Sequence, residues 1–517
     1  MTIERKVGMG IAGQPSGSFD VAEVFSTHLY TGNGNSNIVN NNGIDLAGEG
    51  GMVWYRRRDG SENNSIEDTV RGLDKVIRSD TTSAQGDPGA YGLQAFNSNG
   101  FTSGYDTSGS KYVSWTFRKK KKFFDIVTYT GNGSGQTISH SLGGEVGMML
   151  IKRTSETGGW AVYHKSIGTG KYLELSANYA QQNSSAHWSN VGSTSFTVGT
   201  EHDTNKSGAT YVAYLFADNS SDPIEDQMIK CGSAVYSDVS NMIDLPWDTQ
   251  FILIKSVTAA DWHVHDTMRG LDHESGSSFG KKLVPNTSAA EASGALKFYG
   301  HNRRIQMNLP TYANHVYMII RAPMMKEPEA ATEVFAAHSY TGQGGTVLLN
   351  SSIDRVDMGI TIRLNRFDSN AGAHLTTRKT HKELYVHSQV PEHNSNFITL
   401  DSNSLTVPGS YWSNESGVPY LTYAWKAAKG FFDVVTYEGN ATARTIPHSL
   451  GVAPEMIWIK NRDYNEEWVV YVASEGINKW LYLSAVNDSQ SGVATLMWNN
   501  IVPSATVLSL GTHNFSN

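Results

Sequence analysis

The stretch that decides the fold is residues 123–133, which read FFDIVTYTGNG and are followed by TISHSLG at 137–143. The same pair recurs about three hundred residues later, as FFDVVTYEGN at 431–440 and TIPHSLG at 445–451. Looser copies are VFSTHLYTGNG at 24–34 and VFAAHSYTGQG at 334–344. Recurrence at a fixed period indicates tandem copies of one structural unit.

Tyrosines mark the period of this repeat. Tyr30 and Tyr129 are 99 residues apart, Tyr340 and Tyr437 are 97 apart, and Tyr129 and Tyr340 are 211 apart, about two periods. A degenerate fifth copy is therefore expected near residue 235, where 233–238 read SAVYSD. Units of roughly a hundred residues can each hold a core, so we predict five domains arranged like beads on a string.

The first four units close with runs of β-branched and aromatic residues, a composition typical of strands. These runs are YVSWTF at 112–117, YVAYLF at 211–216, VYMII at 316–320 and LTYAW at 421–425. The fifth unit has no such ending, because the sequence stops at Asn517 about where this strand should begin. We therefore expect the natural chain to continue beyond residue 517.

Further strand patterns recur inside the units. Apolar runs that end in a basic residue occur at 51–59, 148–154, 251–256 and 456–463, and shorter strand patterns occur at 160–164, 262–266, 468–472, 171–176, 479–484, 195–199 and 99–104. Several short strands at regular spacing predict a sandwich or jelly roll. The predicted fold is all-β, with about five jelly-roll β-sandwich domains at 23–120, 121–222, 223–326, 327–428 and 429–517 after an extended arm at 1–22.

Composition limits the classes of function. Charged residues make up 17% of the chain and the formal net charge is −8, so no general nucleic-acid or membrane surface is expected. A single cysteine, Cys231, allows no intrachain disulfide and is best interpreted as a small buried apolar residue. Neither a secretory signal nor an apolar stretch long enough to span a membrane is present in the sequence.

The order of these motifs supports a family resemblance. A strand ending in Lys or Arg is followed by RGLD at 71–74, NSNGFT at 97–102 and YVSW at 112–115. This order resembles the concanavalin-A-like jelly-roll modules that occur in tandem in structural and tail-fibre-like proteins of marine bacteriophages, including cyanophages. The resemblance covers nearly the whole chain. Lectin-like members imply glycan recognition, but no sugar-binding motif matches residue by residue, so no binding residues are transferred.

The most specific local motif is DTVRGLD at 68–74, which recurs as DTMRGLD at 266–272. It could be a surface loop for a ligand. The favoured interpretation is a structural turn in which Arg pairs with a carboxylate and Gly adopts a positive φ. The residues concerned are Arg71, Gly72, Asp74, Arg269, Gly270 and Asp272.

Two charged clusters have weaker functional interpretations. Residues 118–122, RKKKK, could bind nucleic acid or lipopolysaccharide, but a solvated link with edge-protecting lysines is favoured. His263, His265 and Asp266 could begin a metal site, yet no further ligands follow at zinc spacing. No metal and no cofactor are predicted, although a calcium loop stays open as an alternative.

Catalytic motifs are not found in the sequence, and adjacent carboxylates such as Glu466 and Glu467 would point to opposite faces of a strand. The chain is therefore predicted not to be an enzyme. Trp188 and Trp412 lie in Ser/Asn-rich stretches and are the weak candidates for exposed, ligand-binding aromatics.

The glycine-containing stretch 1–22 is expected to be an extended arm that either docks on another surface or forms a mobile terminus. The candidates for docking on a virion are Val7, Met9, Ile11 and Phe19. The leading functional hypothesis is a tail-fibre or tail-appendage component of a phage particle. Its partners would be other copies of itself and other virion proteins, and it would assemble in the host cytoplasm. The alternative is an adhesin for host glycans; a capsid decoration protein or a polysaccharide hydrolase ranks last.

Overall fold

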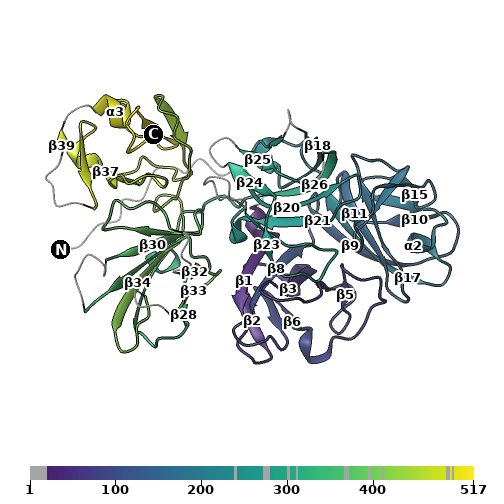
Figure 1. Cartoon of the computed structure of the whole chain (residues 1–517). Coiled ribbons are helices and arrows are strands. Elements are labelled where there is room, and N and C mark those ends of the chain that lie inside the picture. Colours follow the sequence, from purple (N-terminus) through teal and green to yellow (C-terminus); the bar gives the residue numbers. More distant parts are fainter. Residues whose placement is uncertain are drawn as a thin grey trace, which may run out of the picture.

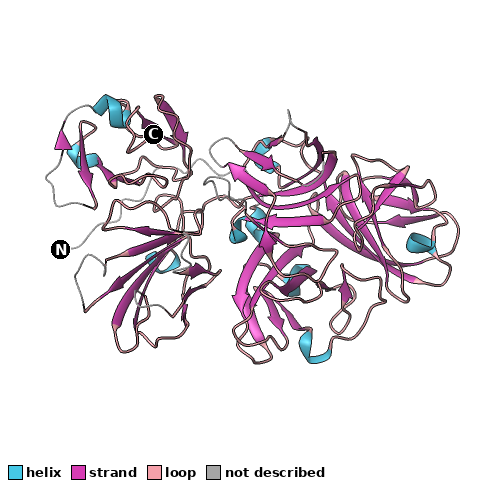
Figure 2. Cartoon of the chain, viewed as in Figure 1, coloured by secondary structure: helices cyan, strands magenta, loops and turns pink. Residues whose placement is uncertain are grey.

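The computed structural model describes residues 20–517 apart from 238–240, 272–279, 300–302, 310–311, 366–371, 394–397, 410–412, 485–489 and 492–493. The described chain is all-β, with antiparallel sheets and only short helices (Figures 1 and 2). Most of the N-terminal arm therefore lies outside the described residues.

Unit 1 (residues 20–119) consists of a large and a small antiparallel sheet. The large sheet has the order β1 (Phe25–Thr31), β8 (Lys111–Arg118), β3 (Gly51–Arg57), β4 (Ser65–Asp68) and β5 (Ile77–Arg78). The small sheet has the order β2 (Ile38–Asn41), β7 (Gly100–Ser103) and β6 (Leu93–Asn97), and α1 (Leu46–Glu49) follows β2. The first and the last strand of the unit are thus neighbours.

Unit 2 (residues 120–220) repeats this order. Its large sheet is β9 (Phe124–Thr130), β17 (Thr210–Ala217), β11 (Val146–Arg153), β12 (Trp160–His164), β13 (Lys171–Glu174) and β14 (Gln182–Asn183). Its small sheet is β10 (Gln136–Ser139), β16 (Ser195–Val198) and β15 (Trp188–Val191), with α2 (His202–Asn205) before β17.

Units 3 and 4 (residues 224–322 and 330–428) keep the same order. Unit 3 has β18 (Ile229–Val235), β26 (Asn314–Arg321), β20 (Thr249–Ser256) and β21 (Trp262–Asp266), then β19 (Met242–Asp244), β25 (Arg304–Met307) and β24 (Leu296–Tyr299), and the pair β22 (Lys281–Lys282) and β23 (Ala292–Ser293). Unit 4 has β27 (Phe335–Thr341), β34 (Pro419–Trp425), β29 (Met358–Arg363), β30 (His374–Thr377) and β31 (Glu383–Tyr385), then β28 (Val347–Asn350), β33 (Ser404–Val407) and β32 (Thr399–Leu400). The degenerate copy expected near residue 235 is β18.

Unit 5 (residues 429–517) keeps only part of this order. It has β36 (Met456–Ile459), β37 (Val469–Val472), β38 (Lys479–Tyr482) and β39 (Gln490–Ser491), the pair β35 (Arg444–Pro447) and β40 (Val507–Leu510), and α3 (Ala494–Trp498). Residues 433–440, which repeat the opening strand of unit 2 almost letter for letter, form no strand.

The repeated tyrosines explain why the opening and closing strands pair. In the antiparallel registers Tyr30 lies opposite Tyr112, Tyr129 opposite Tyr211 and Tyr340 opposite Tyr420. Each pair is stacked, with ring centroids 5.2, 5.1 and 5.3 Å apart. Directly opposite aromatic pairs stabilise and align antiparallel strands, so this repeated tyrosine fixes the register of the unit.

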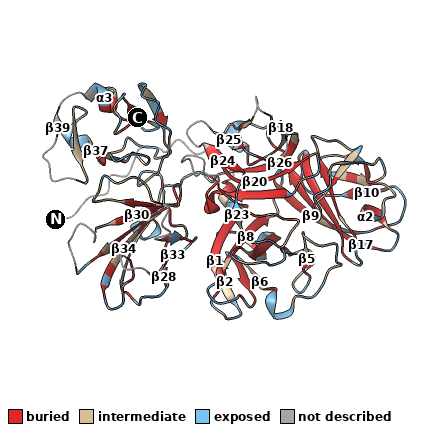
Figure 3. Cartoon of the chain, in the orientation of Figure 1, coloured by how far each residue is buried: buried red, intermediate tan, exposed pale blue. Residues whose placement is uncertain are grey.

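The expectation of beads on a string is wrong for units 1–3, because they share one hydrophobic core. Phe117 of unit 1 lies 5.3 Å from Phe216 of unit 2 and 6.1 Å from Phe251 of unit 3, and Figure 3 shows the buried strands meeting there. All eight residues of β11 and of β20 are buried. A strand buried on both faces needs a neighbour on each, and here the second neighbour is another unit.

Units 4 and 5 form a second group, drawn in green to yellow in Figure 1. This group joins unit 1 along β1, where the amide of Leu29 donates to Ser402 Oγ at 2.9 Å. The fully buried Asp401 lies 3.4 Å from the ammonium of Lys111 and also accepts from Thr31 Oγ1 at 3.3 Å. A buried carboxylate is tolerated here because it is paired and hydrogen-bonded.

Candidate functional site: the contacts between units and an open groove

The first copy of the Asp–Arg motif is a buried contact between two units. Asp68 accepts from the guanidinium of Arg71 at 2.6 Å and from the hydroxyl of Tyr214, in unit 2, at 2.7 Å. Arg71 also donates to the Tyr214 hydroxyl at 3.1 Å. Gly72 has φ +90°, the left-handed conformation that favours glycine.

The second copy does the same between units 3 and 1. Asp266 accepts from Arg269 at 2.7 Å and from the indole nitrogen of Trp115, in unit 1, at 3.0 Å. The Arg269 guanidinium lies 5.4 Å from the centre of the Trp115 ring, within cation–π range. Gly270 has φ +88°. Asp74 of the motif has φ +63°, whereas Asp272 lies outside the described residues.

His164 provides the equivalent contact in unit 2, a role that was not predicted from the sequence. It ends β12, as Asp68 ends β4 and Asp266 ends β21. Its Nε2 lies 3.1 Å from the carbonyl oxygen of Tyr317 in unit 3, and burial lowers its pKa to about 4. The three contacts run from unit 1 to 2, from 2 to 3 and from 3 back to 1, so they close a ring. The position of His164 in the repeat could have predicted this contact. Its residue type could not, because units 1 and 3 have an aspartate at this position.

A second repeated contact comes from the tryptophan near the start of the same strand. The indole nitrogens of Trp160, Trp262 and Trp468 donate to main-chain carbonyls of the preceding unit, at Arg78 (3.0 Å), Glu174 (2.8 Å) and Tyr385 (2.9 Å). Unit 5 is thus attached to unit 4 by the contact that attaches unit 2 to unit 1.

A lysine at or next to the C-terminal end of β11, β20 and β36 is partly or wholly buried at these contacts. Burial lowers the pKa of Lys152, Lys255 and Lys460 to about 8. Lys152 donates to the carbonyl of Thr82 in unit 1 at 3.2 Å, and Lys460 donates to that of Gln389 in unit 4 at 3.0 Å. These hydrogen bonds compensate part of the cost of burying an ammonium group.

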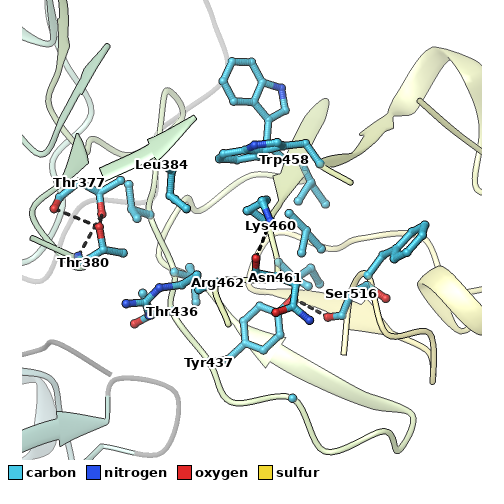
Figure 4. A pocket seen from close by; sticks show the side chains of 18 of the residues that line it. Thr377, Thr380, Leu384, Thr436, Tyr437, Trp458, Lys460, Asn461, Arg462 and Ser516 are labelled. Carbon is cyan, nitrogen blue, oxygen red and sulfur yellow. Dashed lines mark hydrogen bonds between the residues drawn. The ribbon is translucent and has the colours of Figure 1, made fainter. Parts of the chain in front are cut away.

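An open groove of about 1190 Å³ runs between units 4 and 5. One wall is the segment 431–440 and the other includes β36, and Figure 4 shows Tyr437, Trp458 and Lys460 along it. Phe431, Met456 and Trp458 are exposed by 42%, 55% and 39%. Thr377, which ends β30 as Asp68 ends β4, also lines the groove.

The remaining sequence-predicted residues lie elsewhere. Trp188 is only 1% exposed and packs against Tyr163 with ring centroids 5.8 Å apart, so the proposal of an exposed aromatic at this position is wrong. It failed because a Ser/Asn-rich context says nothing about the face of β15 on which Trp188 stands. Trp412 and the docking candidates Val7, Met9, Ile11 and Phe19 lie outside the described residues.

The charged clusters are tied to neighbouring groups. Lys119 lies 3.3 Å from Asp125 and Lys122 lies 3.1 Å from Asp222. Burial lowers the pKa of His263 to about 4, and no group of three potential metal ligands occurs in the described part of the chain. Cys231 is buried, as expected, and burial raises the pKa of its thiol. No helix among the described residues is long and apolar enough to cross a bilayer.

Comparison with known proteins places the chain in a family. Residues 20–302 and 330–517 match the sequence profile of a domain of unknown function, DUF7483. The chain belongs to this family. No curated protein matches the chain. The interruption between the two matched ranges contains β25 and β26 of unit 3 and the link to unit 4, so the first range covers units 1 and 2 and the first part of unit 3.

Proposed function

We propose that this DUF7483 chain is a structural component of a bacteriophage particle, a tail fibre or tail appendage built from about five concanavalin-like jelly-roll modules. The ring of contacts carries the proposal. Units 1–3 are joined by buried hydrogen bonds and one core, which suits a rigid body that bears load. The proposal assigns the chain no catalytic activity and no cofactor.

In this proposal the chain attaches to the particle through its N-terminal arm, through Val7, Met9, Ile11 and Phe19, and packs with other copies of itself. Mass spectrometry of purified virions tests it, by peptide detection and by the copy number relative to the capsid and tail proteins. A few to a dozen copies are expected. Absence from the particle would refute the proposal, and hundreds of copies would instead indicate a capsid decoration protein.

Particle attachment by the arm has its own test. Deletion of residues 1–22 should abolish incorporation into virions while the purified protein keeps its β-sheet circular dichroism. Unchanged incorporation would contradict attachment by the arm without affecting the virion assignment.

A glycan-binding adhesin is the second candidate, and one observation favours it. Tyr91 and Tyr105 of unit 1 are 70% and 44% exposed, with ring centroids 5.7 Å apart. Exposed aromatic rings with a polar edge suit stacking on sugars. On a glycan array, Tyr91→Ala should abolish binding, while Tyr179→Ala, at an exposed tyrosine of unit 2, should not. No glycan binding by the unaltered chain would remove this candidate.

A further inference from the structure

One buried position of the repeat holds an asparagine in units 2 and 4 and an aspartate in unit 1. In unit 2 the amide nitrogen of Asn205 donates to the carbonyl oxygens of Ser134 and of Gly199, the residue after β16. It also donates to Asn132 Oδ1 at 3.1 Å, and the amide oxygen of Asn205 accepts from the main-chain amide of Asn132 at 2.9 Å. Three oxygen atoms therefore surround the Asn205 amide nitrogen.

Unit 4 has the same arrangement. The amide nitrogen of Asn414 donates to the carbonyl oxygen of Gly345, which stands where unit 2 has Ser134. The amide oxygen of Asn414 accepts from the main-chain amide of Gln343 at 2.9 Å. In both units the side-chain amide thus joins the turn after the opening strand to the segment before the closing strand.

Unit 1 keeps the main-chain contacts of this turn but has Asp106 in place of the asparagine. The amide of Gly34 donates to the carbonyl oxygen of Asp106 at 3.1 Å. The amide of Asn35 donates to Asn33 Oδ1 at 2.9 Å. Both hydrogen bonds have counterparts in unit 2, at 2.9 and 2.8 Å. By position, the oxygens that surround the amide nitrogen in unit 2 correspond to Asn33 Oδ1 and to the carbonyls of Asn35 and of Gly104, the residue after β7.

The Asp106 carboxylate has no hydrogen atoms to donate to these oxygens. It is 6% exposed, it accepts from the hydroxyl of Ser103 at 2.7 Å, and it forms no ion pair with any described residue. Burial raises the pKa of Asp106 from the ordinary 3.8 to about 6. A buried carboxylate beside other oxygen atoms needs a positive partner, which is either a proton or a cation.

The hydroxyl of Tyr30 is a second buried polar group at this place. In units 2 and 4 the matching hydroxyls of Tyr129 and Tyr340 donate at 2.6 Å to the carbonyl of the residue before the asparagine. Tyr30 is 5% exposed, and its hydroxyl forms no hydrogen bond to any described residue. Burial and the charge of Asp106 raise the pKa of this hydroxyl, so the Asp106 carboxylate lies near it.

We propose that Asp106 and the surrounding oxygens of unit 1 bind a calcium ion, which takes the place of the side-chain amide nitrogen of units 2 and 4. Calcium binds carboxylate, carbonyl and amide oxygens in irregular geometries and often keeps a bound water. Such a water can donate to the Tyr30 hydroxyl. Because Asp106 is the only acidic ligand, we expect a dissociation constant on the order of 10⁻⁴ to 10⁻³ M.

The ion ties the turn at 33–35 to the segment that carries Tyr105. Tyr105 precedes Asp106 in the chain, and its ring forms the exposed pair with Tyr91. Calcium therefore holds in place the exposed end of unit 1. This inference goes beyond the proposed function and rests neither on a virion role nor on glycan binding.

Terbium luminescence measured on chain 1–517 tests the proposal. Terbium binds in calcium sites, and nearby tyrosines such as Tyr30 and Tyr112 transfer excitation to it. Calcium should displace the terbium, and magnesium should displace it less well, because magnesium requires a near-ideal octahedral geometry. Asp106→Asn should abolish the signal and keep the β-sheet circular dichroism, because it installs the residue of units 2 and 4. The matched control Asp74→Asn removes the same charge at an exposed position of unit 1 and should bind as the unaltered chain does.

The reverse substitution, Asn205→Asp, should add a second calcium site in unit 2, measured by equilibrium dialysis. Equal binding by the unaltered chain and by Asp106→Asn would overturn the proposal. So would the absence of calcium binding at about 10 mM, roughly ten times the highest expected dissociation constant. A transition near pH 6 that calcium does not shift would also overturn it, because the carboxylate would then hold a proton in place of the ion.

Discussion

Units 2 and 5 begin with nearly the same sequence and do not have the same structure. FFDIVTY in unit 2 forms most of β9, paired along its length with β17, whereas FFDVVTY in unit 5 contributes one isolated bridge between Ala428 and Phe432. The difference lies in the partner, because Tyr129 stacks on Tyr211, while Tyr437 has the Arg444 guanidinium 5.7 Å from its ring centre. Strand formation here depends on a partner about eighty residues away and not on local propensity.

The same two units also differ in what surrounds them. Unit 2 contacts unit 1 through Trp160 and unit 3 through His164, and its central strands are buried on both faces. Unit 5 contacts unit 4 through Trp468 but has Val472 where unit 2 has His164. We therefore expect units 1–3 to be more stable than unit 5, because the contacts of the closed ring stabilise them and unit 5 is not part of that ring.

The largest effect is expected from breaking the ring at Asp266. Asp266→Ala leaves the fully buried guanidinium of Arg269 with the Glu291 carboxylate, 3.2 Å away, but without its closer partner, and it removes the acceptor of the Trp115 indole. Removal of one partner of a buried ion pair typically costs about 3–5 kcal/mol. Urea-dependent hydrogen exchange should report this loss in β20 and β8 and leave unit 5 unchanged.

Asp244→Ala is the matched control in the same unit, because its ion pair with Arg304 is exposed. Its cost should be about 1 kcal/mol or less. Equal losses for the two variants would mean that the ring contact adds no stability beyond that of a surface pair.

A smaller effect is expected from acid, through His164. Its pKa is about 4 in the folded chain against the ordinary histidine value of 6.5, so between these pH values the unfolded state binds a proton that the folded state does not. Stability contributed by the neutral histidine is present above pH 6.5 and is lost as the pH falls towards 4, by about 3 kcal/mol in total. Urea midpoints of unit 2 at pH 7 and pH 4.5 measure this loss.

His164→Asn should flatten that pH dependence in unit 2. Unit 5, with Val472 at this position, should lack this contribution in the unaltered chain. A variant whose loss between pH 7 and 4.5 equals that of the unaltered protein would show that other buried histidines, such as His28 and His263, account for the acid sensitivity.

Much of the fold could be predicted from the repeat. The strands at 160–164 and 262–266 were predicted to the residue, because a tryptophan and alternating apolar residues mark them. The turn with positive φ at Gly72 and Gly270 and the Asp–Arg pairing follow from residue chemistry. The association of units 1–3 could not be predicted, because the apolar sequences of β11 and β20 fit the core of an isolated sandwich as well as a core shared between units.

The site was less predictable for the same reason. Tyr214, Trp115 and Tyr317 look like ordinary residues of a closing strand, and only the tertiary structure places them against Asp68, Asp266 and His164. The groove could be anticipated only in part. The fifth unit was expected to lack a closing strand, but only the tertiary structure places residues of unit 4 such as Thr377 along the groove.

The smallest effect is expected from the lysine of unit 5. Lys460 has a pKa of about 8 in the folded chain against the ordinary lysine value of 10.5, so the unfolded state holds the extra proton between these pH values and stability rises from pH 8 towards 10.5. Lys460 is only half-buried, and solvent screening should limit this rise to about 1 kcal/mol. The fully buried Lys152 of unit 2 should give a steeper rise.

Urea-dependent hydrogen exchange of β36 and β11 at pH 8 and 9.5 measures how stability changes with pH in units 5 and 2. The measurement is made on the unaltered protein and on Lys460→Gln and Lys152→Gln. If stability changed equally with pH in units 2 and 5, Lys152 in the ring would be no better shielded from water than Lys460 in unit 5.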